Sequence, residues 1–269
     1  NKVKYNPNIV AILVINPDNP TWVVFSKEIL LSIVDIAKKY NLFLIFDEIY
    51  EKLTFEEEDK ILLADIVDDV PWISMKWISK DIPWPGSRCG WIEVYNIDSD
   101  DNFKEYIKSI LSSKMLEVCS TTLPQYVLPE IYESKNYKLS LETRIKKYKN
   151  RADLAENILG WLDEITLIKP KWAFYLSITF NMDKVNTSYI PYIKEQEIES
   201  YISDFLIWVE RFDKKFCYYL LGKTWICSVP LSWFNSTFEW FRITLLEENR
   251  ERFIFILETI KNFILEYKK

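Results

Sequence analysis

One lysine and one arginine stand out by their spacing. Lys80 lies eight residues before Arg88, with two prolines and Gly86 between them. Apolar runs flank this stretch, at Ile73 to Ile78 and at Cys89 to Tyr95, which predicts a turn between two strands. A rigid, partly apolar turn can make an amine reactive, because burial and a neighbouring cation both lower its pKa. For the pair alone, two solvated surface cations remain the better interpretation.

Three further polar side chains follow predicted strands. Asp47 and Tyr50 come after the apolar run Leu42 to Phe46, and Asn19 comes after Val10 to Ile15. Continuous apolar runs of this length predict buried parallel strands. In doubly wound sheets, ligands bind at the carboxyl ends of the strands. Each residue alone is more often a turn, cap or core residue, so only their occurrence together favours a site.

The elements between these residues form a predicted βαβ unit. Ser26 is placed to cap a helix whose apolar positions recur at helical spacing from Ile29 to Tyr40. A strand, a helix and a second strand in this order predict a parallel sheet. From Lys138 to Leu162, a long charged helix is expected to leave one domain and enter another. We place the boundary near its middle, giving a large domain at 1–149 and a small domain at 150–269.

The small domain has a different pattern. Its predicted strands are Ile165–Ile168, Ala173–Ile178, Trp225–Val229 and Phe241–Leu245. The stretch Glu199–Leu221 is expected to be mostly helical, and Phe253–Tyr267 is a predicted closing helix. Short strands between amphipathic helices indicate an α+β domain. Arg242 lies in the last of these strands, where taken alone it is more often the partner in a surface ion pair.

Composition narrows the classes of function. A net charge of -6 over 269 residues argues against a nucleic-acid partner, and Glu56 to Asp59 is expected to be an acidic surface loop. No apolar run approaches the ~20 residues of a membrane helix. Histidine is absent and the four cysteines have no metal-ligand spacing, so we predict no metal site. Reduced, buried thiols in a cytoplasmic protein are the default interpretation.

Four short motifs contain the candidate residues. They are Asn16-Pro-Asp-Asn-Pro-Thr21, Phe46-Asp-Glu-Ile-Tyr50, Ser79-Lys80 through Pro85-Gly86-Ser-Arg88-Cys-Gly90, and Phe241-Arg-Ile-Thr244. Together they resemble the class I/II aminotransferases, which are pyridoxal-phosphate (PLP) enzymes of fold type I. Any one motif is weak, but four in this order are specific, and they span the chain. The resemblance implies an α/β fold with a mostly parallel sheet in the large domain, plus a smaller α+β C-terminal domain.

The resemblance also implies a role for each residue around the cofactor ring. Lys80 would form a Schiff base with the cofactor aldehyde and, after substrate displaces it, move the proton between Cα and C4′. Asp47 would pair with the pyridine nitrogen and keep it protonated, so that the ring withdraws electrons. Asn19 and Tyr50 would hydrogen-bond the phenolic oxygen of the ring.

Both arginines are implied to bind anions. Arg88 would hold the cofactor phosphate in a bidentate pair. Arg242, from the small domain, would bind the α-carboxylate of the amino-acid substrate. The predicted function is transfer of an amino group between an amino acid and a 2-oxo acid. A homodimer is expected, because sites of this family usually form at a subunit interface.

Two alternatives stay open. A PLP-dependent carbon–sulfur lyase or decarboxylase could use the same fold, since the Arg242 carboxylate contact suits either. A non-catalytic, truncated remnant could act as a binding domain. The family has a substantial segment before the point that matches Asn1, containing the first strands of the large domain, a phosphate-binding loop and a ring-stacking aromatic. We therefore expect this chain to be the C-terminal part of an aminotransferase, with a large domain that is incomplete at its N-terminus.

Tryptophan stands where the family usually has glycine. The chain has 4 glycines and 11 tryptophans, whereas ordinary chains carry about 7% glycine. The affected positions are Trp22, Trp77, Trp172, Trp225, Trp233 and Trp240. An indole at a site that needs positive φ is a steric outlier, so we hypothesise that UGA codons for glycine were translated as tryptophan. UGG codons there would contradict this hypothesis and favour a diverged homologue that tolerates the rings.

Overall fold

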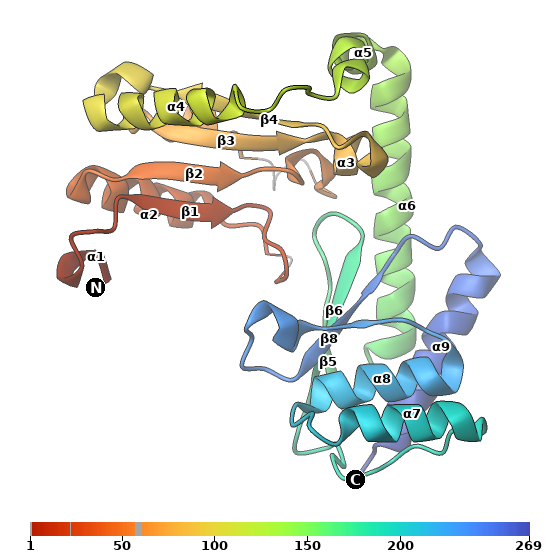
Figure 1. Cartoon of the computed structure of the whole chain (residues 1–269). Coiled ribbons are helices and arrows are strands. Elements are labelled where there is room, and N and C mark those ends of the chain that lie inside the picture. The colour runs from red at the N-terminus through yellow and green to blue at the C-terminus, as the bar shows by residue number, and fades with distance from the viewer. Residues whose placement is uncertain (1, 22, 57–60) are drawn as a thin grey trace. The chain divides into compact units, whose positions relative to one another are not determined.

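The computed structural model divides into two compact units. It describes residues 2–21, 23–56 and 61–269. The first unit extends to residue 146 and the second consists mainly of residues 147–269, so the division falls within the long helix α6 (Lys135–Leu159). The predicted boundary after residue 149 falls in the same helix, and as a division between functional domains it stays a prediction. Each unit has a four-stranded sheet of its own (Figure 1).

The sheet of the first unit is mostly parallel. Its strands are β1 (Ala11–Ile15), β2 (Phe43–Asp47), β3 (Trp72–Trp77) and β4 (Gly90–Tyr95). They lie in the order β1-β2-β3-β4, with β1, β2 and β3 parallel and β4 antiparallel to β3. The continuous apolar runs of the sequence suit this arrangement, because helices cover both faces of a parallel sheet.

Helices lie on both faces of this sheet, but they bury its strands unevenly. In β1 only Val14 is buried and Leu13 is 60% exposed, so the expectation of a buried first strand is wrong. Helix α2 (Lys27–Tyr40) connects β1 to β2, and its first turn is capped by Ser26, whose hydroxyl accepts a hydrogen bond from the amide of Ile29. Asn41 ends the helix in the left-handed region, at φ 50°. Helix α2 packs on one face of the sheet and α4 (Asp101–Lys114) packs on the other (Figure 1).

A turn joins β3 to β4, as predicted from the sequence, and this turn contains two short helices. These are α3 (Ile78–Asp81) and η4 (Pro85–Ser87). The other helices of the first unit are α1 (Lys2–Tyr5) and α5 (Thr122–Glu133), with short 3-10 turns at Glu51–Leu53, Leu63–Asp65 and Ile97–Ser99. Of the predicted acidic loop, residues 57–60 lie outside the described part of the chain.

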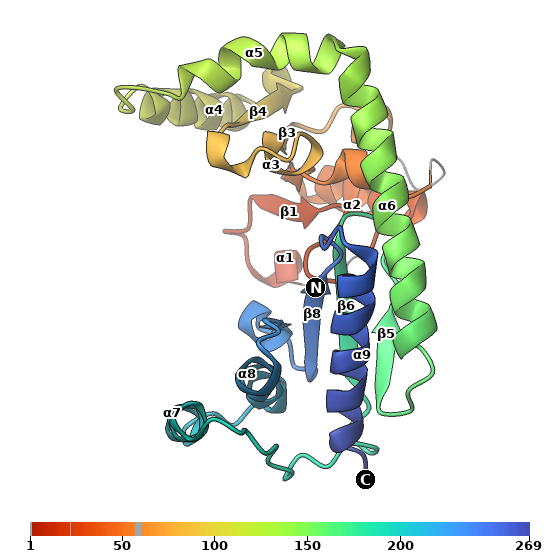
Figure 2. The ribbon, with the colours of Figure 1, turned by 90° about the vertical axis from the view of Figure 1, so that its right-hand side faces the viewer.

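The second unit contains an antiparallel sheet with helices packed against it. Its strands lie in the order β5 (Ile165–Ile168), β6 (Tyr175–Phe180), β8 (Trp240–Thr244) and β7 (Val229–Pro230). Its helices are α7 (Gln196–Leu206), α8 (Phe212–Thr224) and α9 (Arg250–Glu266), with a 3-10 turn at Leu231–Phe234. Figure 2 shows α9 running beside the sheet. The mostly parallel first sheet and this α+β unit agree with the predicted fold class.

One predicted element of the second unit is confirmed and another is wrong. The stretch Glu199–Leu221 is mostly helical, as expected, and consists of two helices, because the chain leaves α7 and begins again at Phe212. The predicted strand Trp225–Val229 is a strand only at its last residue. Trp225 instead ends α8 in the left-handed region, at φ 60° and ψ 15°, and its amide donates to the carbonyl of Leu221. Glycine is the usual residue at this cap, since it alone lacks a Cβ.

Side-chain exposure differs widely among the tryptophans and the cysteines. Trp172 and Trp240 are buried, whereas Trp225 is 76% exposed and Trp233 58% exposed; Trp22 lies outside the described residues. Cys119 and Cys227 are exposed, so the expectation of buried thiols is wrong for these two. In the part of the chain that the structure describes, no helix is long and apolar enough to cross a membrane.

Candidate active site

The carboxyl ends of the parallel strands carry the predicted cofactor residues. Asp47 ends β2, and Lys80 lies in α3, directly after β3. Because β2 and β3 are parallel neighbours, with Asp47 in register with Met75, both side chains belong to the same end of the sheet. Asn19 lies in the turn just past the end of β1, the next strand. The fold thus brings three of the predicted residues to one sheet edge.

Lys80 lies over the ring of Tyr50. Its Nζ is 5.4 Å from the ring centroid, within the range of a cation–π contact. Tyr50 follows β2 and is 3% exposed, so its phenol is held in a fixed position. The amine and the phenol that the sequence assigned to one site are therefore neighbours.

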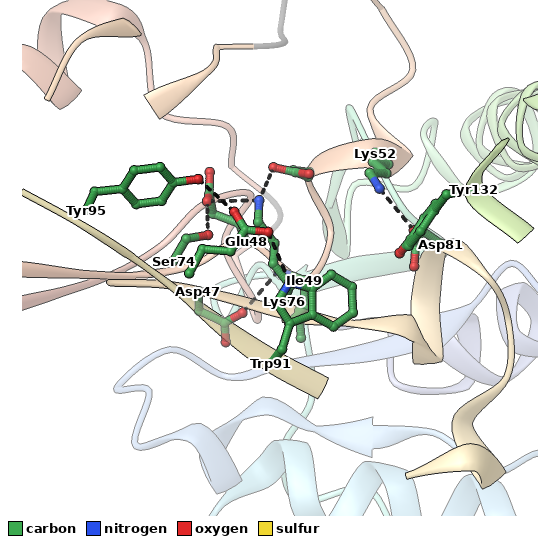
Figure 3. Close-up of polar contacts among 12 residues, drawn as sticks. Asp47, Glu48, Ile49, Lys52, Ser74, Lys76, Asp81, Trp91, Tyr95 and Tyr132 are labelled. Atoms are coloured by element: carbon green, nitrogen blue, oxygen red, sulfur yellow. Dashed lines mark hydrogen bonds and ion pairs between the residues drawn. The ribbon is translucent and has the colours of Figure 1, made fainter. Parts of the chain in front are cut away.

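Asp47 is a half-buried carboxyl at this edge (Figure 3). Its Oδ1 accepts a hydrogen bond from the amide of Ile49 at 3.2 Å. Burial raises the pKa of the Asp47 carboxyl, and the Ile49 hydrogen bond offsets only part of that rise. A cation placed next to this side chain would favour its ionised form.

Arg88 contacts Trp77 in the turn between β3 and β4. Its backbone is left-handed, at φ 51°, and its Nη1 donates to the carbonyl of Pro85 at 3.1 Å. The guanidinium carbon lies 5.0 Å from the ring centroid of Trp77. The same indole covers Gly90, where an added Cβ would lie 2.4 Å from Cε3 of Trp77. The indole therefore fills space beside the arginine that was predicted to bind phosphate.

Arg242 lies in β8, within the second unit. It is in register with Ser177 of β6 and with Val229 of β7. Its guanidinium carbon is 4.6 Å from the ring centroid of Tyr175 and 4.9 Å from that of Phe234. Two aromatic rings beside a half-buried guanidinium restrict its motion and limit its hydration, which suits recognition of a carboxylate.

The sequence reasoning missed an ionic network beside Asp47. Lys76 Nζ lies 3.0 Å from Oε2 of Glu48 and 2.6 Å from Oε2 of Glu51, and the hydroxyl of Ser74 donates to Glu48 (Figure 3). Burial raises the pKa of Glu48, although the charge of Lys76 opposes the rise. Burial also opposes the charge of Lys76, but the two carboxylates raise its pKa overall. Lys76, a charged residue within a strand of mostly apolar residues, was the sequence feature that could have indicated this network.

A second missed cluster surrounds Asp81, the residue after Lys80. The hydroxyls of Tyr132 and Tyr137 donate to Oδ2 of Asp81 at 3.0 and 2.9 Å, and Lys52 Nζ lies 3.5 Å from the same oxygen. Figure 3 shows Lys52, Asp81 and Tyr132 together. Asp81 is 5% exposed. Burial and then the charge of Asp81 raise the pKa of both phenols.

Arg144 of α6 joins this cluster to the backbone at Lys80. Its Nη1 donates to the carbonyl of Lys80 at 3.3 Å, and its Nη2 donates to the carbonyl of Asp81. These partners lie more than sixty residues apart in the sequence, so no local pattern pointed to them.

A cavity of about 240 Å³ lies near the same sheet edge, but other residues line it. They include Asn16, Glu48, Lys52, Thr54 and Leu62. Asp47 and Lys80 do not line it, so we assign the cavity no part in the site. Within the described residues, no cluster of cysteine, aspartate and glutamate side chains could hold a metal ion.

Comparison with known proteins identifies the family. The sequence matches the family described as aminotransferase class I and II over residues 2–254. The chain belongs to the class I/II aminotransferases. The residues at the sheet edge can therefore be compared with what PLP, the cofactor of this family, requires.

Individual aminotransferases support this assignment. The chain is 46% identical over 268 residues to an uncharacterized aminotransferase of Methanocaldococcus jannaschii, covering 100% of this chain and 62% of that protein. It is 31% identical over 189 residues to glutamate-pyruvate aminotransferase AlaA of Haemophilus influenzae, covering 69% of this chain and 45% of that protein. The chain thus spans at most 62% of the length of these two relatives.

Solved aminotransferase structures share the fold. Alanine aminotransferase from Pyrococcus furiosus superposes with a TM-score of 0.76 at 26% identity, covering 95% of this chain and 57% of that one. Tyrosine aminotransferase from Leishmania infantum has a TM-score of 0.77 at 18% identity, covering 97% and 57%, and shows likeness of fold alone. These likenesses confirm the predicted fold class.

The sheet edge of this chain fits PLP, the cofactor of the family, with one exception. The raised pKa of the Asp47 carboxyl reflects a half-buried position, which a protonated ring nitrogen would suit as a counter-charge. The amine of Lys80 beside the phenol of Tyr50 matches an aldehyde with a neighbouring phenolic oxygen. The exception is Trp77, whose ring contacts Arg88 where the phosphate was expected.

Proposed function

We propose that the whole protein is a PLP-dependent aminotransferase that moves an amino group between an amino acid and a 2-oxo acid. The observation that carries the proposal is the grouping of Lys80, Tyr50 and Asp47 at the carboxyl edge of the family's sheet. When bound, the cofactor supplies an electron sink for negative charge at the substrate Cα.

Each residue at the edge has a defined task in this proposal. Lys80 would hold the cofactor through its amine and would move a proton at the substrate Cα. Asp47 holds a proton on the ring nitrogen, while Asn19 and Tyr50 bind the phenolic oxygen. Arg88 is the proposed partner of the phosphate, and the Trp77 indole that contacts it is the one feature that does not suit this role.

The second unit supplies the proposed substrate contact. Arg242 binds the α-carboxylate, and the flanking rings of Tyr175 and Phe234 support its guanidinium. Two of the proteins that resemble this chain are named for glutamate, pyruvate and alanine. These compounds are therefore the substrates that we would test before others.

We also propose that the protein is a cytoplasmic homodimer. Its four cysteines are free thiols, which supports a reducing compartment. A continuous segment of the first unit exposes six large apolar side chains, namely Leu111, Met115, Leu116, Val118, Leu123 and Tyr126. An exposed group of large apolar side chains often contacts another protein, and a second copy is the partner that we propose. Met115→Lys should then weaken dimerisation in analytical ultracentrifugation.

The direct test uses the full-length protein with PLP. Borohydride reduction followed by peptide mass spectrometry should find the cofactor on Lys80, and Lys80→Ala should lower transamination between glutamate and pyruvate by about 10²- to 10⁴-fold or more. Lys27→Ala, which removes an exposed lysine, is the control and should behave like the wild type. Unchanged cofactor attachment or activity in Lys80→Ala would overturn the assignment. Release of pyruvate or carbon dioxide without amino transfer would instead indicate a lyase or a decarboxylase.

A further inference from the structure

We propose that Asp81, Tyr132, Tyr137 and Arg144 form a positioning device that sets the direction of Lys80. This inference rests on the proposed function, because it concerns how the lysine is presented to the cofactor and to the substrate. None of the four residues needs to touch either compound. They act through the backbone and through the residue next to Lys80.

The first part of the device holds the backbone. Helix α3 is only four residues long, and the last carbonyls of a helix have no partners within it. Arg144 supplies partners for two successive carbonyls, those of Lys80 and Asp81, from two nitrogens of one guanidinium. Because a guanidinium is planar and rigid, this fork fixes the orientation of the peptide group that follows Lys80.

The second part holds the neighbouring side chain. Both phenols and the ammonium of Lys52 converge on Oδ2 of Asp81, which is almost fully buried. The Lys52 Nζ also lies 4.0 Å from the ring centroid of Tyr132, so that ring is itself held in position. A buried carboxylate with several strong partners resists displacement, because moving it would leave charge without compensation.

The two anchors leave Lys80 with a defined direction. Successive residues of a helix differ by ~100° around its axis, so Asp81 can point into its cluster while Lys80 points to Tyr50. The contact of Lys80 Nζ with the Tyr50 ring, 5.4 Å from its centroid, agrees with this division. The buried side chain serves as the fixed point, and the adjacent amine is the group that has to reach reacting atoms.

Proton transfer is sensitive to such positioning. A displacement of roughly 1 Å at a reacting group can cost on the order of 100-fold in rate. Loosening the device should therefore slow the step that Lys80 performs more than it weakens substrate binding. A role in folding alone would instead lower the amount of active protein and leave the turnover of each loaded site unchanged.

The experiment compares Tyr132→Phe, Tyr137→Phe, the double variant and Arg144→Lys in the full-length protein. Borohydride trapping on Lys80 counts the loaded sites, so that kcat is expressed per trapped site. We expect kcat of the double variant to fall about 10- to 100-fold with little change in KM, and Arg144→Lys to retain more activity than Arg144→Met. Tyr201→Phe, which changes an exposed tyrosine of α7, is the control.

A measurement without cofactor separates positioning from chemistry. Hydrogen exchange of the peptide containing Ile78–Asp81 should become faster in the double variant and in Arg144→Met, while Tyr201→Phe should match the wild type. Wild-type kcat per trapped site in all variants, or an equal rise in KM, would overturn the positioning role. An absence of trapping on Lys80 in the wild type would overturn the proposed function itself, and this inference would fall with it.

Discussion

The two units bury charge for different purposes. In the first, the buried carboxylates Glu48 and Asp81 are bound by other side chains, close to Lys80 in the sequence or at the same sheet edge. In the second, the buried Asp213 accepts hydrogen bonds from the backbone amides of Lys214 and Ser232, and the buried Glu164 pairs with Lys268, whose Nζ lies 3.0 Å from its Oε1. Backbone partners fix architecture, whereas interacting ionisable side chains shift one another's pKa values. In the first unit, the interacting side chains Glu48 and Asp81 directly follow the predicted site residues Asp47 and Lys80.

The apolar parts of the units differ as well. The core of the second unit centres on Phe216, whose ring lies 4.8 to 5.5 Å from those of four other aromatic residues. They are Phe180, Phe241, Phe263 and Tyr267. The core of the first unit lies between α2 and the sheet and consists mostly of Leu, Val and Ile side chains. The second unit therefore depends on one ring cluster, and the first places its ionic networks at the edge of an aliphatic core.

Among the substitutions that test this difference between the two units, Phe216→Ala should have the largest effect on stability. Removing a fully buried ring should lower the free energy of unfolding by about 3–5 kcal/mol, as measured by urea denaturation of the full-length protein. Phe255→Ala removes a ring that is 68% exposed and should change stability by no more than about 0.5 kcal/mol. Equal effects of the two substitutions would show that the ring cluster is not the centre of this core.

Lys76→Met tests the ionic network of the first unit. The substitution leaves Glu48, whose side chain is 6% exposed, beside Glu51 without the shared cation, and should cost about 3 kcal/mol at pH 7. Loss of Lys76 raises the pKa of Glu48 further above its ordinary value, since Lys76 opposes the effect of burial.

The raised pKa of Glu48 determines how the stability of the Lys76→Met variant depends on pH. A carboxyl with a raised pKa in the folded state stabilises the fold at low pH, and this stability is lost as the pH rises through the raised pKa. The difference between Lys76→Met and the wild type should therefore shrink as the pH is lowered from 7 toward the ordinary glutamate pKa of about 4.3. A difference that stays constant with pH would mean that Lys76 contributes packing rather than charge.

Trp225→Gly is expected to have the smallest effect, and the opposite sign. A side chain in the left-handed region costs roughly 1–2 kcal/mol, and Trp225 has φ 60° with its ring mostly exposed. Glycine should therefore stabilise the protein by about 1 kcal/mol. Trp225→Ala keeps a Cβ and should gain less. If alanine stabilises as much as glycine, the backbone strain at this cap is not the cause.

Local sequence patterns predicted an element correctly where a single type of signal, such as an apolar run or a capping residue, was present. The strands β1 and β2 followed from continuous apolar runs, and the start of α2 followed from Ser26. The strand predicted at Trp225 failed because tryptophan favours strands, whereas its backbone conformation is one that glycine prefers. A glycine at 225 would have predicted the end of α8 correctly.

The residues of the candidate site likewise fall into two groups, those that local sequence patterns identify and those that they do not. Lys80, Asp47 and Tyr50 could be found because they follow strands and belong to recognisable motifs. The partners of Asp81 could not, since Tyr132 and Tyr137 lie 51 and 56 residues further along the chain. Nothing in the local sequence specifies which tyrosines a buried carboxylate will meet. That choice is made by the packing of α5 and α6 against α3.

The two phenols on Asp81 have a practical consequence. A free phenol ionises near pH ~10 and gains near-ultraviolet absorbance as it does so, but burial and Asp81 raise the pKa of Tyr132 and Tyr137. In an alkaline titration, the absorbance of Tyr132 and Tyr137 should stay unchanged at pH values where solvent-exposed tyrosines ionise. Their late appearance would report that the turn carrying Lys80 is intact, in protein that has never bound a cofactor.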